Sequence, residues 1–600
     1  MKRFSDRYTF AFDVAPEALW RAVSDTDAVN RDAGFPPVRY SYEPRPDGNG
    51  PATIAHAQLG PIAIEWEEPP FTWEAPHRVA VERRFRGGPF ARFSSDVRVV
   101  RDGDGARIEH AVELDARAAL GTLLAPAVLA RGRAGAARAY ALAARRARET
   151  PPERPTRPVL PALPAASILG VTRFADALEI LRPYTEHEPE IAARLAALVE
   201  HADDVLVARM RPYVFADAWH LPRDRVLAAM LAATRRGLLD LSWTIVCPSC
   251  RGQKNSVASL VRVGGMVHCD QCGIEYGPEF DRNVEVTFDA RPSGRSVAGP
   301  VYCLAGPQTA RQTLAQTALA PGRTASLDVE FEAGAYVVQV LPDRAARVTV
   351  EEDAGAATLA LRIEDTRVRA DTSVVRAGSI HVEIVNASSR EALVRVTEAE
   401  LSDQIATAAD VTSLQAFRDL FSSELLAEGI ELAIRSLTIV FTDVVGSTKM
   451  YSDAGDARAF RLVREHFDAL HEVIAVRRGT IVKTIGDAVM AVFVDPRDAV
   501  EAVLLFAAAA APLQLRIGMH RGPCIAMRAN DHLDYFGATV NLASRVGHAS
   551  GPGEILLTST IADDPRVADI LPGGERGTVT LRDIPEPVEV VRVSAAVRVG

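Results

Sequence analysis

The sequence predicts a multidomain protein of mixed α and β structure, with several separately folded units along one chain. Its 600 residues exceed what a single hydrophobic core usually organises. Segments with helical periodicity and segments with strand-like alternation also follow one another in distinct blocks. A proline-rich stretch, PPERPTRPVLPALP at 151–164, separates the first block from the rest and is typical of a semi-rigid linker.

Composition and charge indicate a soluble globular protein. The formal net charge is -10, and this mildly acidic balance argues against a general nucleic-acid coat, so no nucleic-acid partner is expected. The first residues, MKRFSDRYTF, lack the apolar run of a signal peptide. The longest uncharged apolar segment of note, AVLLFAAAAAPL at 502–513, is too short to span a bilayer. We therefore expect a cytoplasmic protein without a transmembrane segment.

Residues 1–150 have the pattern of one α+β unit. Tyr8, Phe10 and Phe12 alternate as in a half-buried strand, a helix follows, and several short β-like runs come next. The unit ends in an Ala/Arg-rich helical stretch at about 116–148. This order resembles the START-like helix-grip fold, and the resemblance implies a cavity for an apolar ligand under the last helix. A small α+β packing domain is the alternative interpretation.

Two cysteine pairs follow a predicted helical region at 165–240. The pairs are CPSC and CDQC, separated by eighteen residues, a spacing typical of the two knuckles of a zinc ribbon. The predicted zinc ligands are Cys247, Cys250, Cys269 and Cys272. Because sulfur would fill all four positions of a tetrahedral site, the predicted Zn²⁺ is structural. A nucleic-acid adaptor is the alternative role for such a ribbon, and the acidic net charge disfavours it.

A β-rich stretch and a helical connector lead to the C-terminal region. Residues 281–402 contain β-like runs with turn signals every ten or so residues, the spacing of an antiparallel sandwich. The connector at 403–434 has an apolar stripe that includes Phe417 and Phe421. Such a stripe usually packs against a neighbouring domain or a second copy, so the connector is a candidate transmitter.

Two aspartates beside apolar strands make the C-terminal region the candidate site. A buried strand, LTIVFT, ends at Asp443, and a predicted hairpin of GTIVKT and AVMAVF has Asp487 in its turn. A buried carboxylate needs compensation, and two that lie close together would share a hard cation such as Mg²⁺. Taken singly, each aspartate has the alternative interpretation of a turn cap.

A predicted helix, VNLASRV, completes the pattern. It carries Asn541 and Arg545 four residues apart and therefore on one face. The always-charged guanidinium of Arg545 suits a phosphate group. Asp534 precedes this helix in a loop or at a strand end.

The segment 437–596 resembles the catalytic domain of class III nucleotidyl cyclases. The motifs FTDVVGST, KTIGD, GMHRG and DYFGATVNLASR occur in the family's order and at similar spacing. The resemblance implies a homodimer with active sites at the interface and two Mg²⁺ or Mn²⁺ ions per site. It also implies the roles of six residues: Asp443 and Asp487 bind metal, Lys483 and Asp534 read the purine, Asn541 orients the nucleotide, and Arg545 stabilises the transition state. The aspartates of one protomer would face the other four residues of its partner.

The residues that would read the purine predict ATP as the substrate. Adenine has an amine donor for Asp534 and a ring-nitrogen acceptor for Lys483, whereas guanine would place an acceptor oxygen against the Asp534 carboxylate. We therefore expect an adenylate cyclase that forms cyclic AMP and pyrophosphate and is regulated by its N-terminal domains. A guanylate cyclase and a catalytically silent nucleotide sensor are the alternatives.

The predicted units are a START-like domain at 1–150, a linker at 151–164, a helical region at 165–240, a zinc ribbon at 241–280, a β-sandwich at 281–402, a helical connector at 403–434 and a cyclase domain at 435–600.

Overall fold

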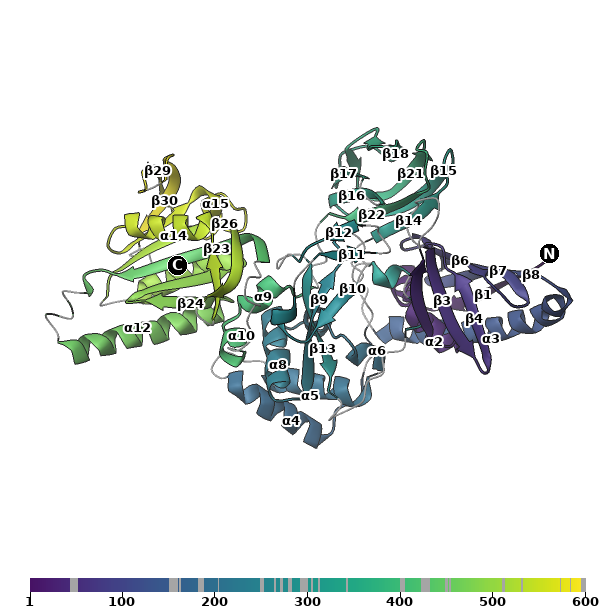
Figure 1. Ribbon diagram of the computed structural model, residues 1–600, viewed down its shortest axis with the longest axis horizontal. Helices are drawn as coiled ribbons and strands as arrows, with labels where there is room; N and C mark the ends of the chain where they lie inside the picture. Colours follow the sequence, from purple (N-terminus) through teal and green to yellow (C-terminus); the bar gives the residue numbers. More distant parts are fainter. Residues whose placement is uncertain are drawn as a thin grey trace.

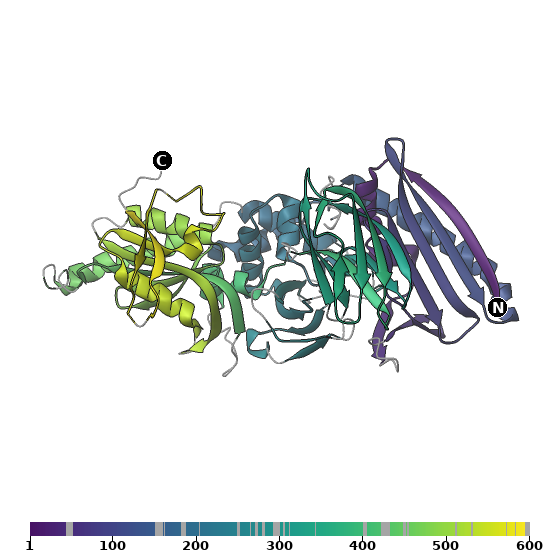
Figure 2. The same cartoon turned by 90° about the horizontal axis from the view of Figure 1, so that it is seen from above.

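The computed structural model of the 600-residue chain describes most of its length. The described residues are 1–43, 52–149, 160, 163–181, 188–202, 204–248, 253–263, 266–269, 274–278, 283–291, 301–303, 306–310, 313–341, 344–399, 405–421, 432–447, 450, 452, 455–509, 513–529, 532–571, 573–582 and 584–594. The N-terminal and C-terminal units lie at opposite ends of an elongated molecule, with a helical region between them (Figures 1 and 2). Within the described residues, no helix is both long and apolar enough to cross a membrane.

The N-terminal unit is a curved antiparallel sheet packed against a long C-terminal helix. Its elements are β1 (Lys2–Phe12), α1 (Pro16–Val23), α2 (Thr26–Ala33), β2 (Val38–Glu43), β3 (Ala52–Leu59), β4 (Ile62–Glu67), β5 (Thr72–Glu74), β6 (Arg78–Phe85), β7 (Phe90–Asp102), β8 (Gly105–Ala116) and α3 (Ala119–Glu149). Tyr8 and Tyr140 are buried between β1 and α3, beside His110 of β8. The order of strand, helix, antiparallel strands and long final helix agrees with the START-like prediction.

A β-sandwich joins this sheet edge to edge. Its strands are β14 (Thr313–Leu319), β15 (Thr324–Phe331), β16 (Gly334–Leu341), β17 (Arg344–Glu351), β18 (Thr358–Ile363), β19 (Val368–Ala370), β20 (Val374–Arg376), β21 (Gly378–Asn386) and β22 (Ala392–Glu398). Strand β14 pairs with β5, so the N-terminal sheet continues through β14, β22, β16, β17 and β20. The indole Nε1 of Trp73 donates to the Thr313 carbonyl at 3.0 Å across this junction.

The middle region combines helices with a small sheet. Its elements are α4 (Ile168–Leu178), α5 (Glu188–His201), α6 (Asp204–Val207), α7 (Pro212–Trp219), α8 (Arg223–Arg235), β9 (Leu239–Val246), β10 (Gln253–Val257), β11 (Val267–Cys269), β12 (Ile274–Tyr276) and β13 (Val284–Ala290). Strand β13 pairs with β9, so it belongs to this region and not to the sandwich in which the 281–402 range had placed it. Its residues are buried at nearly every position, as expected for a strand covered on both faces.

The predicted zinc site is only partly within the described residues. Cys247 follows β9 and Cys269 ends β11, and both are fully buried. Cys250 and Cys272 lie outside the described residues. In the part of the chain that the structure describes, no three His, Cys, Asp or Glu side chains form a metal-binding group. The zinc ribbon therefore stays a prediction.

The connector and the C-terminal domain complete the chain. The elements are α9 (Ala408–Thr412), α10 (Gln415–Leu420), β23 (Leu432–Val444), α12 (Asp456–Val476), β24 (Thr480–Ile485), β25 (Ala488–Phe493), α13 (Pro496–Ala509), β26 (Leu515–Ala529), β27 (His532–Phe536), α14 (Ala538–Ala549), β28 (Glu554–Thr558), α15 (Ser559–Ala562), β29 (Glu575–Val579) and β30 (Val588–Ser594). One sheet runs β24-β25-β23-β26-β28-β30-β29, with β27 paired to β26. The predicted strand before Asp443, the hairpin around Gly486 and the helix that carries Asn541 are all present.

Candidate active site

The sheet register places Asp443 and Asp487 at the same edge of the domain. Strand β23 lies between β25 and β26, and Asp443 is the penultimate residue of β23. Thr442 pairs with Val489 of β25, and Asp487 lies two residues before Val489 in the β24–β25 turn. Gly486 has a φ of 66°, which allows that tight turn. Two apolar strands thus bring two carboxylates together.

The electrostatics of these aspartates fit a bound cation. Burial raises the pKa of Asp443, and the nearby negative charge of Asp487 raises it further, against opposing effects of Arg516 and His548. The Oδ2 atom of Asp487 is buried and has no hydrogen-bond partner among the described residues. A buried carboxylate oxygen of this kind is costly unless a cation or donor satisfies it. The pair therefore fits Mg²⁺ or Mn²⁺, which typically bind one or two carboxylates together with substrate phosphates.

Lys483 and Asp534 form a direct ion pair although they are distant in sequence. The Lys483 Nζ atom donates to Asp534 Oδ2 at 2.6 Å and lies 5.6 Å from the ring centroid of Phe536. The other oxygen, Oδ1 of Asp534, accepts from the Tyr535 backbone N–H at 2.8 Å. The Asp534 side chain is 13% exposed and that of Lys483 is 37% exposed. The carboxylate is therefore largely shielded from water, whereas the ammonium group is open to a ligand.

A bulge in the β24–β25 ladder directs Lys483. The register shifts between Ile481 and Lys483, so β24 contains one more residue than its partner at this point. Such bulges re-aim a side chain at the edge of a sheet. This irregularity could not be predicted, because GTIVKT has the composition of an ordinary strand and no local signal marks the extra residue.

Asn541 and Arg545 lie on α14, which packs closely on β26 and β23. The close approach depends on Gly518 of β26, since a Cβ atom there would lie 2.0 Å from the Gly547 backbone nitrogen of α14. Asn541 is exposed and Arg545 is partly exposed. The structure therefore shows one ion pair, Lys483 with Asp534, and one pair of carboxylates near enough for their charges to interact, Asp443 with Asp487. It places Asn541 and Arg545 on a neighbouring helix that faces solvent.

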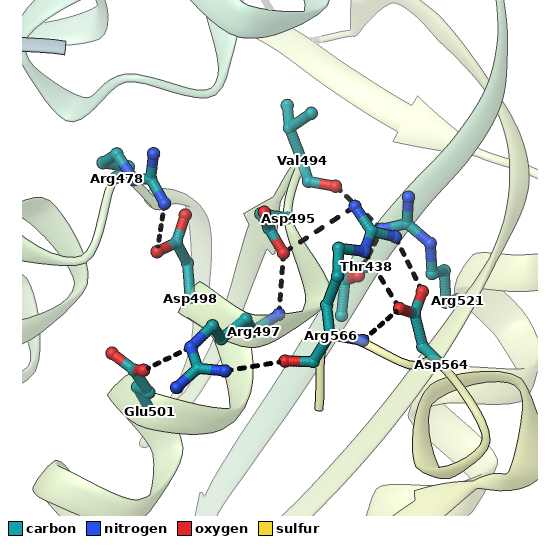
Figure 3. Close-up of polar contacts among 10 residues, drawn as sticks. All are labelled: Thr438, Arg478, Val494, Asp495, Arg497, Asp498, Glu501, Arg521, Asp564 and Arg566. Carbon is teal, nitrogen blue, oxygen red and sulfur yellow. Dashed lines mark hydrogen bonds and ion pairs between the residues drawn. The ribbon is translucent and has the colours of Figure 1, made fainter. Parts of the chain in front are cut away.

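A network of charged side chains links the same strands at a distance from the aspartates. Arg521, from the GMHRG motif, donates to Thr438 Oγ1 at 2.9 Å and to the Val494 carbonyl at 2.7 Å, which ties β26 to β23 and to the end of β25 (Figure 3). Asp564 and Arg566 lie beside Arg521 and join the network to α13 (Figure 3). No functional role was predicted for these residues from the sequence. Their contacts are within the domain, so they stabilise the strands that carry the site.

Two residues that the motifs do not include also touch the site strands. Gln415 and Arg418 of α10 hydrogen-bond to β24 and to β27, the strands that carry Lys483 and Asp534. The sequence had shown only the apolar stripe of this helix, because a side chain that contacts a distant backbone carries no local pattern.

Comparison with protein families agrees with the geometry at both ends of the chain. Residues 432–564 match the adenylate and guanylate cyclase catalytic domain, and residues 4–144 match the polyketide cyclase / dehydrase and lipid transport family. Residues 173–301 match a family of unknown function. The C-terminal unit is therefore a class III cyclase catalytic domain, and the N-terminal unit is a START-like domain.

Relatives extend this classification beyond the catalytic domain. The chain is 30% identical over 343 residues to the uncharacterized protein Rv2212 of Mycobacterium tuberculosis, a match that covers 52% of this chain and 88% of the relative. The chain belongs to the same family as that protein.

Two further relatives match in the catalytic region. An adenylate cyclase of Streptomyces coelicolor is 30% identical over 138 residues, which is 22% of this chain and 35% of that protein. The receptor-type guanylate cyclase gcy-13 of Caenorhabditis elegans is 30% identical over 152 residues, which is 22% of this chain and 15% of that protein. One of these relatives is named an adenylate cyclase and the other a guanylate cyclase, so similarity alone does not decide between ATP and GTP.

Proposed function

We propose that the protein is an adenylate cyclase that converts ATP to 3',5'-cyclic AMP and pyrophosphate. The observation that carries the proposal is the Lys483–Asp534 ion pair at 2.6 Å, in the same domain as the paired aspartates. The family match supports cyclase chemistry, and the ion pair supports the choice of base.

The ion pair presents a donor and an acceptor side by side. A carboxylate has about four lone-pair sites and an ammonium has three N–H donors, so each partner keeps free capacity after the mutual bond. Asp534 can accept from the exocyclic amine of adenine while Lys483 donates to a ring nitrogen. Guanine would oppose its O6 acceptor to the Asp534 carboxylate, and a buried mismatch of this type is strongly rejected.

Asp443 and Asp487 would hold the divalent ions, two per active site, and the buried Oδ2 atom of Asp487, which has no hydrogen-bond partner among the described residues, supports this role. The ions, when bound, supply a lowered pKa of the ribose 3'-hydroxyl and charge balance for the leaving pyrophosphate. Asn541 orients the nucleotide in this scheme. Arg545 donates to the oxygens on the α-phosphorus, where negative charge grows as the 3'-oxygen attacks.

A homodimer would complete the site. In the proposed arrangement, Asp443 and Asp487 of one protomer face Lys483, Asp534, Asn541 and Arg545 of the other, which gives two equal sites. The exposure of Asn541 on α14 supports this arrangement, because a residue that orients a shared nucleotide must face a partner. The START-like domain would bind an apolar ligand, and the N-terminal domains would regulate turnover through the connector.

The test removes the metal-binding charges without changing side-chain shape. Asp443→Asn and Asp487→Asn should each lower cyclic AMP formation by about 1,000-fold or more, since each removes a negative charge from the metal site. Asp468→Asn, an exposed residue of α12, is the matched control and should stay within about twofold of the parent chain, as surface changes usually do. Light scattering should show that all three variants remain dimers. Activity of either site variant above a tenth of the parent would contradict the assignment.

A further inference from the structure

We propose that Gln415 and Arg418, in the connector outside the matched catalytic segment, position the purine-reading pair and thereby set the preference for ATP over GTP. This inference rests on the proposed function. Both residues belong to α10, which lies between the middle region and the C-terminal domain (Figure 1). They are three residues apart and so share one face of the helix.

Gln415 holds β24 at its bulge. Its Oε1 atom accepts from the Ile481 backbone N–H at 2.9 Å and from Thr480 Oγ1 at 3.1 Å. The bulge begins at Ile481 and ends at Lys483, so Gln415 binds the backbone two residues before the base-reading ammonium. Gln415 is only 8% exposed, and burial makes the loss of such hydrogen bonds costly.

Arg418 holds β27 on both sides of Asp534. Its Nη1 atom donates to the Leu533 carbonyl at 3.0 Å, and its guanidinium lies 5.7 Å from the ring centroid of Tyr535. Tyr535 in turn donates its hydroxyl to Thr412 Oγ1 of α9 at 3.4 Å. The residues before and after Asp534 are thus attached to the connector, and Asp534 itself is left to bind Lys483.

The connector is anchored to the middle region as well. Phe417 of α10 packs edge-to-face on Trp243 of β9, with ring centroids 5.9 Å apart. The Val286 backbone N–H of β13 donates to the Ala406 carbonyl at 2.9 Å, just before α9. A displacement of α10 relative to the catalytic sheet would therefore move β24 and β27 and change the spacing of their two base-reading side chains. Gln415 and Arg418 act through Lys483 and Asp534 and are positioning residues.

The test compares nucleotide preference in the full-length chain. Gln415→Ala and Arg418→Ala should each lower kcat/KM for ATP by about tenfold, mainly through a higher KM, while kcat/KM for GTP changes by less than about twofold. Arg418→Lys keeps a donor for the Leu533 carbonyl and should recover part of the ratio. Arg464→Ala, an exposed arginine of α12, is the matched control and should leave the ratio unchanged.

The readouts separate a positioning role from a structural one. A merely structural role would lower turnover of both nucleotides in parallel, and that result, or an unchanged ratio in both alanine variants, would overturn the inference. Equilibrium binding of α,β-methylene-ATP and α,β-methylene-GTP gives the same ratio without turnover. If the parent chain forms no cyclic nucleotide, the proposed function fails, and the binding ratio in the variants still decides whether Gln415 and Arg418 position the pair.

Discussion

Removal of the Asp534 carboxylate should abolish most of the preference for ATP over GTP. The variant Asp534→Ala loses the acceptor for the adenine amine and leaves Lys483 without the partner that holds it at 2.6 Å. A hydrogen bond to a charged group contributes about 1.5–3 kcal/mol, which corresponds to about 10- to 150-fold in kcat/KM. The free energy of unfolding should fall by about 1 kcal/mol or less, because the Lys483 side chain is 37% exposed and water can solvate its charge.

The assay measures initial rates of cyclic AMP and cyclic GMP formation over a range of each nucleotide. The kcat/KM for ATP should fall in the stated range, and that for GTP should stay constant or rise, because the acceptor that repels the guanine O6 atom is gone. The double variant Lys483→Glu, Asp534→Cys reverses the donor and acceptor pattern and should shift the preference further toward GTP. An ATP/GTP ratio that is unchanged in both variants would refute the account of base reading.

Three further predictions concern the support of the site and the metal. Gly518→Ala should lower the free energy of unfolding by about 1–3 kcal/mol and reduce turnover, because its Cβ would collide with the backbone of α14; denaturant unfolding and rate measurements check this. Burial lowers the pKa of His520 from 6.5 to about 4, so the folded state favours the neutral ring. The contribution of the neutral ring to the free energy of unfolding, at most about 3 kcal/mol, is complete above pH 6.5 and is lost as the pH falls toward 4. His520→Gln should therefore flatten the profile of stability against pH between these values. The purified chain should contain one zinc ion by mass spectrometry of its metals, and Cys247→Ser or Cys269→Ser should remove it and lower the melting temperature; a parent chain without zinc would contradict the prediction.

The parts of the fold that could be predicted are those with a local signal. Strand alternation around Tyr8 and the aspartate motifs at Asp443 and Asp487 depend on residues close in sequence, so periodicity and spacing revealed them. The joining of β5 to β14 and of β13 to β9 could not be seen in this way, because any exposed or buried strand edge can pair with many others and the choice depends on the whole fold.

The same distinction separates the motif residues from their supports. Lys483 and Asp534 are 51 residues apart, and only the family resemblance placed them together before the structure showed their contact. Gln415 and Arg418 hydrogen-bond to backbone groups of distant strands. Almost every residue type has the same backbone donor and acceptor, so the sequence does not show which backbone groups these side chains contact. The predicted zinc ligands Cys250 and Cys272 lie outside the described residues, so metal analysis tests them best.

The central claim is tested most directly by offering the purified full-length chain ATP and GTP together at equal concentration, with Mg²⁺ or Mn²⁺. Chromatography then separates cyclic AMP from cyclic GMP, and the product ratio equals the ratio of the two kcat/KM values. We expect cyclic AMP in excess by about 100-fold or more, because a donor and an acceptor that match adenine reject the wrong base. Equal amounts of the two products, or cyclic GMP in excess, would contradict it.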